Sequence, residues 1–183
     1  MVVMSNSNHD HALIEKCRRG DGKALEELVG LYEKPIYNAA YRILGNPDDA
    51  ADATQVVFMK AIEHLDQYDP KYKFFSWIYR IAVNEAINQL KRGRFQQPLD
   101  DSEVATTRGP EATVEAGDLS REIQAGLMGL TEDYRTVVVL RHFSECSYRE
   151  ISEILQIPEK TVKSRLYSAR QVMKDALQSR GVY

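Results

Sequence analysis

The chain contains 183 residues, of which 28% are charged, and its formal net charge at pH 7 is −3. No apolar run approaches the roughly 18 residues that a membrane span requires, and the start of the chain lacks the basic end and apolar core of a signal peptide. Its two cysteines, Cys17 and Cys146, lie far apart and in no metal-ligand spacing. We therefore expect a soluble, cytoplasmic protein that needs no cofactor and in which both cysteines have packing roles.

Charge is distributed unevenly along the chain. Residues 67–95 and residues 135–183 each have a net charge of +4, whereas residues 1–66 have −4 and residues 96–134 have −7. Two basic segments separated by an acidic one predict two nucleic-acid contacts within an otherwise acidic protein.

The spacing of apolar residues is helical almost throughout, and no segment alternates long enough to predict a strand. Residues 137–140 (VVVL) are rich in β-branched residues, but the residues around them resemble the ends of a helix, which favours a helix. Residues 96–117 are rich in Asp, Glu, Thr, Gly and Pro and predict a flexible acidic linker. We therefore predict an all-α protein with a disordered tail (residues 1–11) and two small helical domains (residues 12–95 and 118–183) on either side of that linker.

The first informative helix begins near Asn46, which can cap it, with Pro47 at the first helical position. Its predicted buried side consists of Val57, Phe58, Ala61, Ile62 and Leu65. Its other side consists of Asp52, Gln55, Val56, Met59 and Glu63. An acidic face with exposed Val and Met is typical of a protein-docking surface, although the spacing fits the solvated side of a bundle helix equally well.

A loop that combines aromatic residues with lysines follows at residues 66–75 (DQYDPKYKFF). Aromatic rings provide stacking platforms for unpaired bases, and lysines attract the backbone of single-stranded nucleic acid. Alternatively, the rings pack into the domain core. We expect core packing for Phe75 and Trp77, but we expect Tyr68 and Lys73 to be available to nucleic acid.

The helix predicted for residues 76–92 has one apolar side, formed by Ile78, Ala82, Ala86, Ile87 and Leu90. Its opposite side has Arg80, Asn84, Asn88 and Lys91 at intervals of four, four and three residues. Arg and Asn side chains can recognise base edges. Asn is also unfavourable in a helix interior relative to Ala, so two on one face weakly indicate a function.

Residues 147–177 predict a helix-turn-helix. Ser147 and Glu150 form a capping-box pair, and Pro158 separates the first helix from the second. The apolar stripe of the second helix consists of Val162, Leu166, Ala169, Met173 and Leu177. Its other faces present cations and hydroxyls suited to phosphates and to base edges in a major groove: Lys160, Thr161, Lys163, Ser164, Arg165, Tyr167, Ser168 and Arg170. The alternative is an ordinary two-helix corner with a solvated basic face.

Several motifs in one order resemble the bacterial sigma factors of the extracytoplasmic-function group (group IV) of the sigma-70 family. FSWIYRIAVNEAINQLKR (residues 75–92) is similar to their −10-recognising helix, and DATQVVFMKAIEHL (residues 52–65) resembles their core-polymerase-binding helix. GLTEDYRTVVVLRHFSECSYREISEIL and TVKSRLYSARQ, both within residues 129–171, are similar to their −35-recognising domain. The resemblance covers about residues 12–177 and implies a region 2 domain followed by a region 4 domain.

The resemblance also implies roles for individual residues. Core polymerase would bind at Asp52, Gln55, Val56 and Met59, through the clamp helices of its large subunit, and its flap would be a further contact. The −10 element would be contacted by Tyr68, Lys73, Phe74, Arg80, Asn84 and Asn88, with the loop capturing a flipped base. The −35 element would be contacted by Lys160, Thr161, Lys163, Ser164, Arg165, Tyr167 and Arg170. The chain departs from the family at Val56, where an acidic residue is usual, and at Ser168, where many members have a cation.

A member of this family would be an alternative sigma factor that initiates transcription of a stress- or envelope-response regulon, and a cognate anti-sigma factor would be expected to control it. Two other classes are compatible with parts of the sequence. A stand-alone helix-turn-helix regulator would need a dimer interface, and no heptad or self-complementary apolar face is present to form one. An enzyme would need a metal site at His9-Asp10-His11 or a base at His64 or His142. The first trio falls in the polar tail, and neither of the other two has a nearby carboxylate–histidine arrangement.

Overall fold

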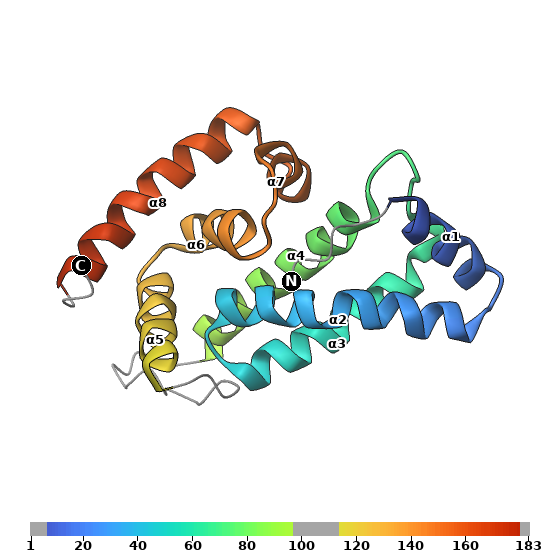
Figure 1. Ribbon diagram of the computed structural model, residues 1–183, viewed down its shortest axis with the longest axis horizontal. Coiled ribbons are helices and arrows are strands. Elements are labelled where there is room, and N and C mark those ends of the chain that lie inside the picture. The colour runs from blue at the N-terminus through green and yellow to red at the C-terminus, as the bar shows by residue number, and fades with distance from the viewer. Residues whose placement is uncertain (1–6, 97–113, 180–183) are drawn as a thin grey trace.

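The computed structural model describes residues 7–96 and 114–179, and within these ranges the chain is helical, with no strand (Figure 1). No described helix is both long and apolar enough to cross a membrane. The elements, in chain order, are α1 (Ser7–Arg18), α2 (Gly22–Leu44), α3 (Pro47–Glu63), the 3₁₀ turn η1 (Leu65–Gln67), α4 (Phe74–Gln96), α5 (Val114–Met128), α6 (Glu132–Val138), the π-helical turn η2 (Val139–Phe143), α7 (Tyr148–Leu155) and α8 (Glu159–Ser179).

Local signals in the sequence set several helix ends. The side chain of Asn46 accepts hydrogen bonds from the backbone N–H groups of Asp48 and Asp49, which confirms the predicted start of α3. Gly45, just before it, has a φ of 81° and ends α2 in the left-handed conformation that glycine adopts without strain.

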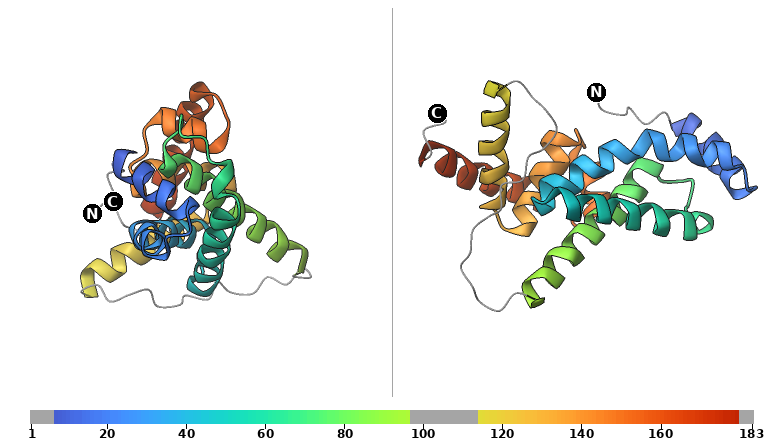
Figure 2. Two further views of the ribbon diagram at one scale, coloured as in Figure 1. Left: turned by 90° about the vertical axis from the view of Figure 1, so that its right-hand side faces the viewer. Right: turned by 90° about the horizontal axis from the view of Figure 1, so that it is seen from below.

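The first four helices form a bundle in which α2 and α3 lie side by side and α4 crosses them (Figure 2). Its centre contains the fully buried side chains of Tyr32, Ile36, Val57, Ile78 and Val83. Burial of these groups is the main favourable contribution to the stability of the bundle. A buried carboxylate also joins two helices, because Glu85 of α4 pairs with Lys60 of α3.

The second half of the described chain contains the predicted helix-turn-helix. The capping box of Ser147 and Glu150 is present at the start of α7, and Gln156 adopts a left-handed conformation at its end. Val162, Leu166 and Ala169 of α8 are buried, as their spacing predicts. Residues 137–140 are helical as expected, although they pass from α6 into the π-helical turn η2.

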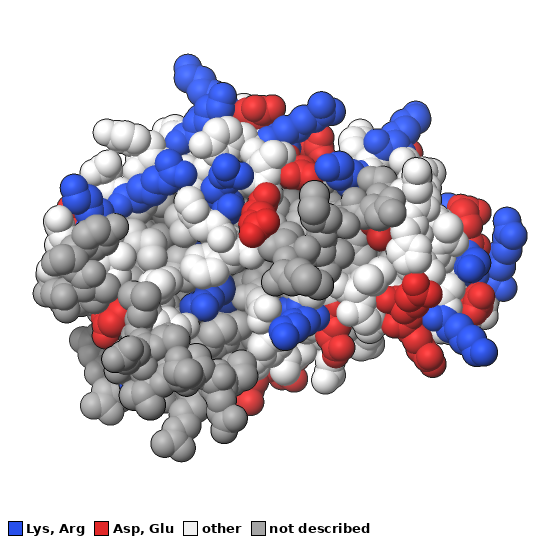
Figure 3. Space-filling model, in the orientation of Figure 1, with Lys and Arg blue, Asp and Glu red and all other residues white. Residues whose placement is uncertain are grey.

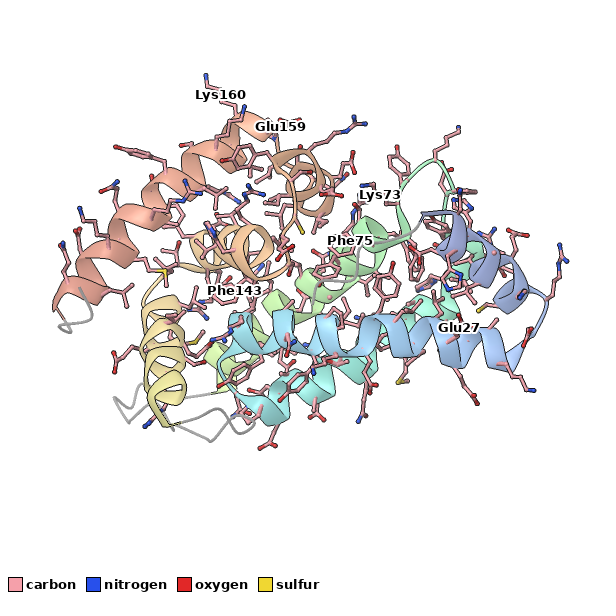
Figure 4. All side chains as sticks on the ribbon, viewed as in Figure 1. Glu27, Lys73, Phe75, Phe143, Glu159 and Lys160 are labelled. Carbon is pink, nitrogen blue, oxygen red and sulfur yellow. The ribbon has the colours of Figure 1, made fainter. Side chains whose placement is uncertain are left out.

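The two halves pack against each other at two places. At one, α4 contacts α7, and at the other the end of α2 contacts α5, α6 and η2. Arg42 of α2 donates to the side chain of Gln124 at 3.0 Å, and its guanidinium lies 4.8 Å from the ring centroid of Phe143. Figure 4 shows Phe143 between α6 and the first bundle. Arg135 of α6 donates to the backbone oxygen of Ile43 at 2.6 Å.

Three expectations require correction or lie outside the described residues. Helix α1 begins at Ser7, so residues 7–11 are helical and not part of a disordered tail. Ile62 is 47% exposed, although its spacing predicted burial. The expected linker falls mostly on residues 97–113, which lie outside the described residues, and its two ends belong to α4 and α5.

Candidate nucleic-acid and polymerase interfaces

Helix α8 presents most of the side chains predicted to contact duplex DNA. Lys160, Lys163, Ser164, Tyr167 and Arg170 are exposed, and Thr161 and Arg165 are half-buried. Figure 3 shows Lys and Arg side chains along α8, and Figure 4 places Lys160 at the end of the helix nearest α7. Because Val162, Leu166 and Ala169 anchor the other side of α8, this cationic surface is held in a fixed orientation.

Arg165 is not simply directed to solvent. Its Nη2 atom lies 2.6 Å from Oδ2 of Asp133, the second residue of α6, and its side chain is only partly exposed. DNA would therefore have to displace Asp133 from this guanidinium, or bind the guanidinium while Asp133 remains paired with it. Helical spacing could not reveal the pair, because the two residues are 32 positions apart.

A further cation, Arg141, lies beside α8 and was not predicted. The ring of Tyr148 lies 5.3 Å from the guanidinium carbon of Arg141 and 5.7 Å from Nζ of Lys163, both distances measured to the ring centroid. Such contacts hold long cationic side chains in defined positions. Nearby, burial and the charges of Arg170 and Arg141 lower the pKa of His142, which favours its neutral form.

Four of the side chains predicted for the −10 element lie on the surface of α4 or just before it. Asn84 and Asn88 are exposed on it. Arg80 donates to the backbone oxygen of Glu153 at 2.7 Å, and Nζ of Lys73, just before α4, lies 2.8 Å from Oε1 of Glu150. Figure 4 shows Lys73 and Phe75 at the start of α4, on the side that faces α7. Helix α7 therefore occupies part of the predicted −10 surface.

Two of the predicted base-stacking rings are buried. Tyr68 is 3% exposed and Phe74 is 2% exposed, and their ring centroids are 5.5 Å apart in an edge-to-face arrangement. The hydroxyl of Tyr68 donates to the backbone oxygen of Tyr72 at 2.6 Å. Burial is the main cause of the raised pKa of Tyr68. Our expectation that Tyr68 stays out of the core is wrong for this conformation, because Tyr32 and Trp77 complete an aromatic cluster around these rings.

The loop presents a different ring to solvent. Tyr72 is 56% exposed, next to exposed Lys71 and Lys73. The expected core positions of Phe75 and Trp77 are confirmed, since Phe75 is buried in the hydrophobic core and Trp77 is half-buried against it. The composition of the loop could have suggested Tyr72 as the ring available to nucleic acid, but no rule of residue spacing favours Tyr72 over Tyr68 for that role.

The outer face of α3 is the predicted protein-docking surface. Asp52, Gln55 and Met59 are exposed, with Met59 at 68%, and Val56 is half-buried. Ile62, one helical turn from Met59, adds a second exposed apolar side chain. It also lines an apolar groove between α2 and α3, together with Leu25, Val29 and Phe58. Exposed apolar side chains grouped in this way are typical of protein interfaces.

The histidines proposed for an enzyme do not converge. His9 pairs with Glu27 at 3.0 Å, the hydroxyl of Tyr32 donates to Asp10 at 2.8 Å, and Nε2 of His11 lies 3.2 Å from the backbone oxygen of Pro70. Within residues 7–96 and 114–179, no three His, Cys, Asp or Glu side chains are grouped so that they could hold a metal ion.

Comparison with known families assigns both halves of the chain to regions of the sigma-70 family. The model of sigma-70 region 2 matches residues 28–96, and the model of sigma-70 region 4 matches residues 120–173. The ECF RNA polymerase sigma factor SigW of Bacillus subtilis is 37% identical over 90% of this chain and 94% of its own length. The chain belongs to the extracytoplasmic-function (ECF) sigma factors. This membership favours a sigma factor over a stand-alone regulator.

Solved structures agree with the fold of this ECF sigma factor. CnrH in complex with the cytosolic domain of CnrY gives a TM-score of 0.74 at 24% identity, over 93% of this chain and 98% of CnrH. The sigma factor RpoE of Bartonella quintana, in complex with the anti-sigma factor NepR, gives a TM-score of 0.71 at 24% identity, over 85% of this chain and 98% of RpoE.

Proposed function

We propose that this ECF sigma factor binds core RNA polymerase through α3, recognises a −10 element with α4 and the loop before it, and recognises a −35 element with α8. The observation that best supports this proposal is the exposure of base-recognising side chains on two separate helices whose apolar sides are buried. Asn84 and Asn88 are exposed on α4, and Lys163 and Ser164 are exposed on α8. Such side chains can bond base edges or phosphates. The domain limits proposed for these functions are residues 12–95 and 118–183.

The polymerase contact is proposed for the exposed face of α3. Asp52, Gln55 and Met59 would meet the clamp helices of the large subunit, with Val56 at the edge of the contact. A methionine suits such a surface because its flexible, polarizable side chain adapts to the partner. The flap of the polymerase is proposed as a contact of the second domain.

In the proposed mechanism, melting and −10 recognition use the loop and α4 together. Tyr72 and Lys73 are already exposed in the loop, whereas Tyr68 and Phe74 would have to leave the aromatic cluster to stack on a base. Capture of an unstacked base offsets part of the few kcal/mol that opening a base pair costs. The protein supplies binding energy and needs no catalysis of its own, and it acts in the cytoplasm, where RNA polymerase acts.

The −35 contact is proposed for the exposed face of α8. Polymerase would hold the two domains at a fixed separation, so that two weak DNA contacts act at high effective concentration. Specificity would then come from both elements and from the spacing between them.

Promoter binding requires a different arrangement of the two halves. Lys73 pairs with Glu150, and Arg80 donates to the backbone oxygen of Glu153. DNA would have to contact both of these cations. We therefore propose that α7 separates from α4 when polymerase binds. An anti-sigma factor that stabilises the closed arrangement would keep this surface covered, and the similar fold of RpoE bound to NepR supports a partner of this kind.

Multi-round transcription from genomic fragments, using core polymerase with and without this protein, tests the proposal. We expect new start sites that share paired upstream elements. If no new transcripts form but the protein alone binds duplex DNA tightly at physiological salt, the protein is a stand-alone regulator and the proposal is wrong.

A further inference from the structure

Helix α1 lies beside the loop that connects α3 to α4 (Figure 1). It precedes the region 2 match, which begins at residue 28, yet it contacts η1 and α4 as well as α2. Leu13 and Ile14 anchor its inner side in the core. The second turn and the last turn of α1 each place a polar side chain against the loop.

Arg18 binds the backbone of the loop at two points. Its Nη2 atom donates to the backbone oxygens of Leu65, at 3.1 Å, and Tyr68, at 2.8 Å. Its Nη1 atom donates to Glu15 at 3.0 Å, which holds the guanidinium in place from within α1. Hydrogen bonds from a charged donor are stronger than those between neutral groups, and the planar guanidinium can serve two acceptors at once.

His11 binds the loop further along. Its Nε2 atom lies 3.2 Å from the backbone oxygen of Pro70, and since a carbonyl can only accept, Nε2 must be the donor. Its ring centroid lies 6.0 Å from that of Tyr68. Because Tyr68 itself donates to the oxygen of Tyr72, the carbonyls at positions 65, 68, 70 and 72 are all bonded, three of them by α1.

We propose that Arg18 and His11 are positioning residues for base capture: they hold the loop backbone so that Tyr72 and Lys73 are presented to the unpaired base. The proposal rests on the proposed function of this loop. A surface connection of this length is normally mobile, and ordering it on binding would consume part of the binding free energy. Anchoring three of its carbonyls in advance reduces that loss. Neither residue contacts the base, so both act through the loop.

The test compares Arg18→Ala with Arg19→Ala, its exposed neighbour of equal charge, in reconstituted holoenzyme on one promoter. The rate of open-complex formation is measured on the duplex and on templates with an abasic site at each non-template position of the −10 element. Removing a captured base should slow the wild type and Arg19→Ala by about tenfold at one position, which corresponds to roughly 1.4 kcal/mol. On the intact duplex, Arg18→Ala should form open complexes about tenfold more slowly than the wild type. An abasic site at that position should slow this variant by less than a further twofold, because the substitution and the missing base remove the same coupled interaction.

Further variants separate positioning from folding. Arg18→Lys retains the charge but not the planar fork, so it should restore only part of the rate. His11→Gln retains a hydrogen-bond donor and should form open complexes faster than His11→Ala. A template with a pre-opened −10 bubble should restore transcription by Arg18→Ala, which a misfolded protein could not do. The proposal is overturned if Arg18→Ala loses the same tenfold at the abasic position as the wild type. If no abasic position affects the wild type, base capture itself is refuted.

Discussion

Lys73 and Glu150 connect the loop before α4 to the first helix of the helix-turn-helix, with Nζ of Lys73 2.8 Å from Oε1 of Glu150. The other carboxylate oxygen, Oε2, accepts from the backbone N–H of Ser147 at 2.9 Å and completes the capping box of α7. One side chain therefore stabilises the start of a helix and holds that helix against the proposed −10 surface.

Glu150→Gln should weaken the closed arrangement while it preserves α7, because Gln can also serve in a capping box. The ion pair is partly exposed and contributes at most about 1 kcal/mol. We expect the free protein to bind single-stranded −10 DNA about two- to fivefold more tightly, as measured by fluorescence anisotropy. Glu33→Gln removes an equal charge from the exposed side of α2. Equal gains in both variants would show that only net charge matters.

The same pair predicts a pH dependence of stability. Burial alone would raise the pKa of Glu150, but hydrogen bonds from Lys73 and Ser147 outweigh it and lower the pKa below its ordinary 4.5. The ionised form therefore stabilises the folded state above about pH 4.5, and this contribution is lost as the pH falls through the lowered pKa. Denaturant unfolding should show Glu150→Gln less stable than the wild type at pH 7, and by a smaller difference at pH 3. A constant difference at both pH values would contradict the assignment.

Two cations of α8 should differ in their effects on −35 recognition. Arg165→Ala should cost about 1–3 kcal/mol on the preferred sequence and relax discrimination at one base pair. Lys160→Ala should weaken binding equally on all sequences and reduce the slope of log affinity against log salt by about 1. Holoenzyme binding to a panel of −35 variants at several salt concentrations measures both effects. Lys174→Ala, at the far end of α8, is the control, and a uniform loss with Arg165→Ala would restrict that residue to backbone contact.

Arg135 should be far more important for stability than an exposed arginine. It is buried and donates to the backbone oxygens of Ile43, Leu127, Met128 and Leu130. Arg135→Ala removes a charged donor from all four of these oxygens and should cost about 3 kcal/mol or more of unfolding free energy. Arg149→Ala, which removes an exposed pair with Glu153, should cost about 0.5 kcal/mol or less. Similar losses in thermal unfolding would show that the carbonyls find other donors.

Met59→Lys should separate polymerase binding from folding. The side chain is 68% exposed, so the unfolding free energy should change by less than about 0.5 kcal/mol. Affinity for core polymerase should fall at least tenfold, because a charge would be buried in the interface without a partner. Val172→Lys makes the same kind of change at an exposed position of α8 and should bind normally. Normal binding of core polymerase by Met59→Lys would show that the polymerase contact does not include this face of α3.

The elements of the fold could be predicted because their signals are local. A cap such as Asn46 or Ser147 bonds backbone groups two or three residues away, and the apolar stripe of α8 repeats within one helix. The order of the motifs was also sufficient to identify the family. These properties depend on neighbours along the chain, which a sequence displays directly.

Only the tertiary structure decided which of the predicted site residues are available. Tyr68 is buried because Phe74, Trp77 and His11 surround its ring, and Arg165 is paired because α6 places Asp133 beside it. Lys73 contacts a carboxylate that follows it by 77 residues. Such contacts depend on how helices pack, and helical periodicity assigns a residue to a face of its helix without determining what lies against that face. The sequence by itself determined the helices and the family, and the packing of the helices determined which surfaces remain open.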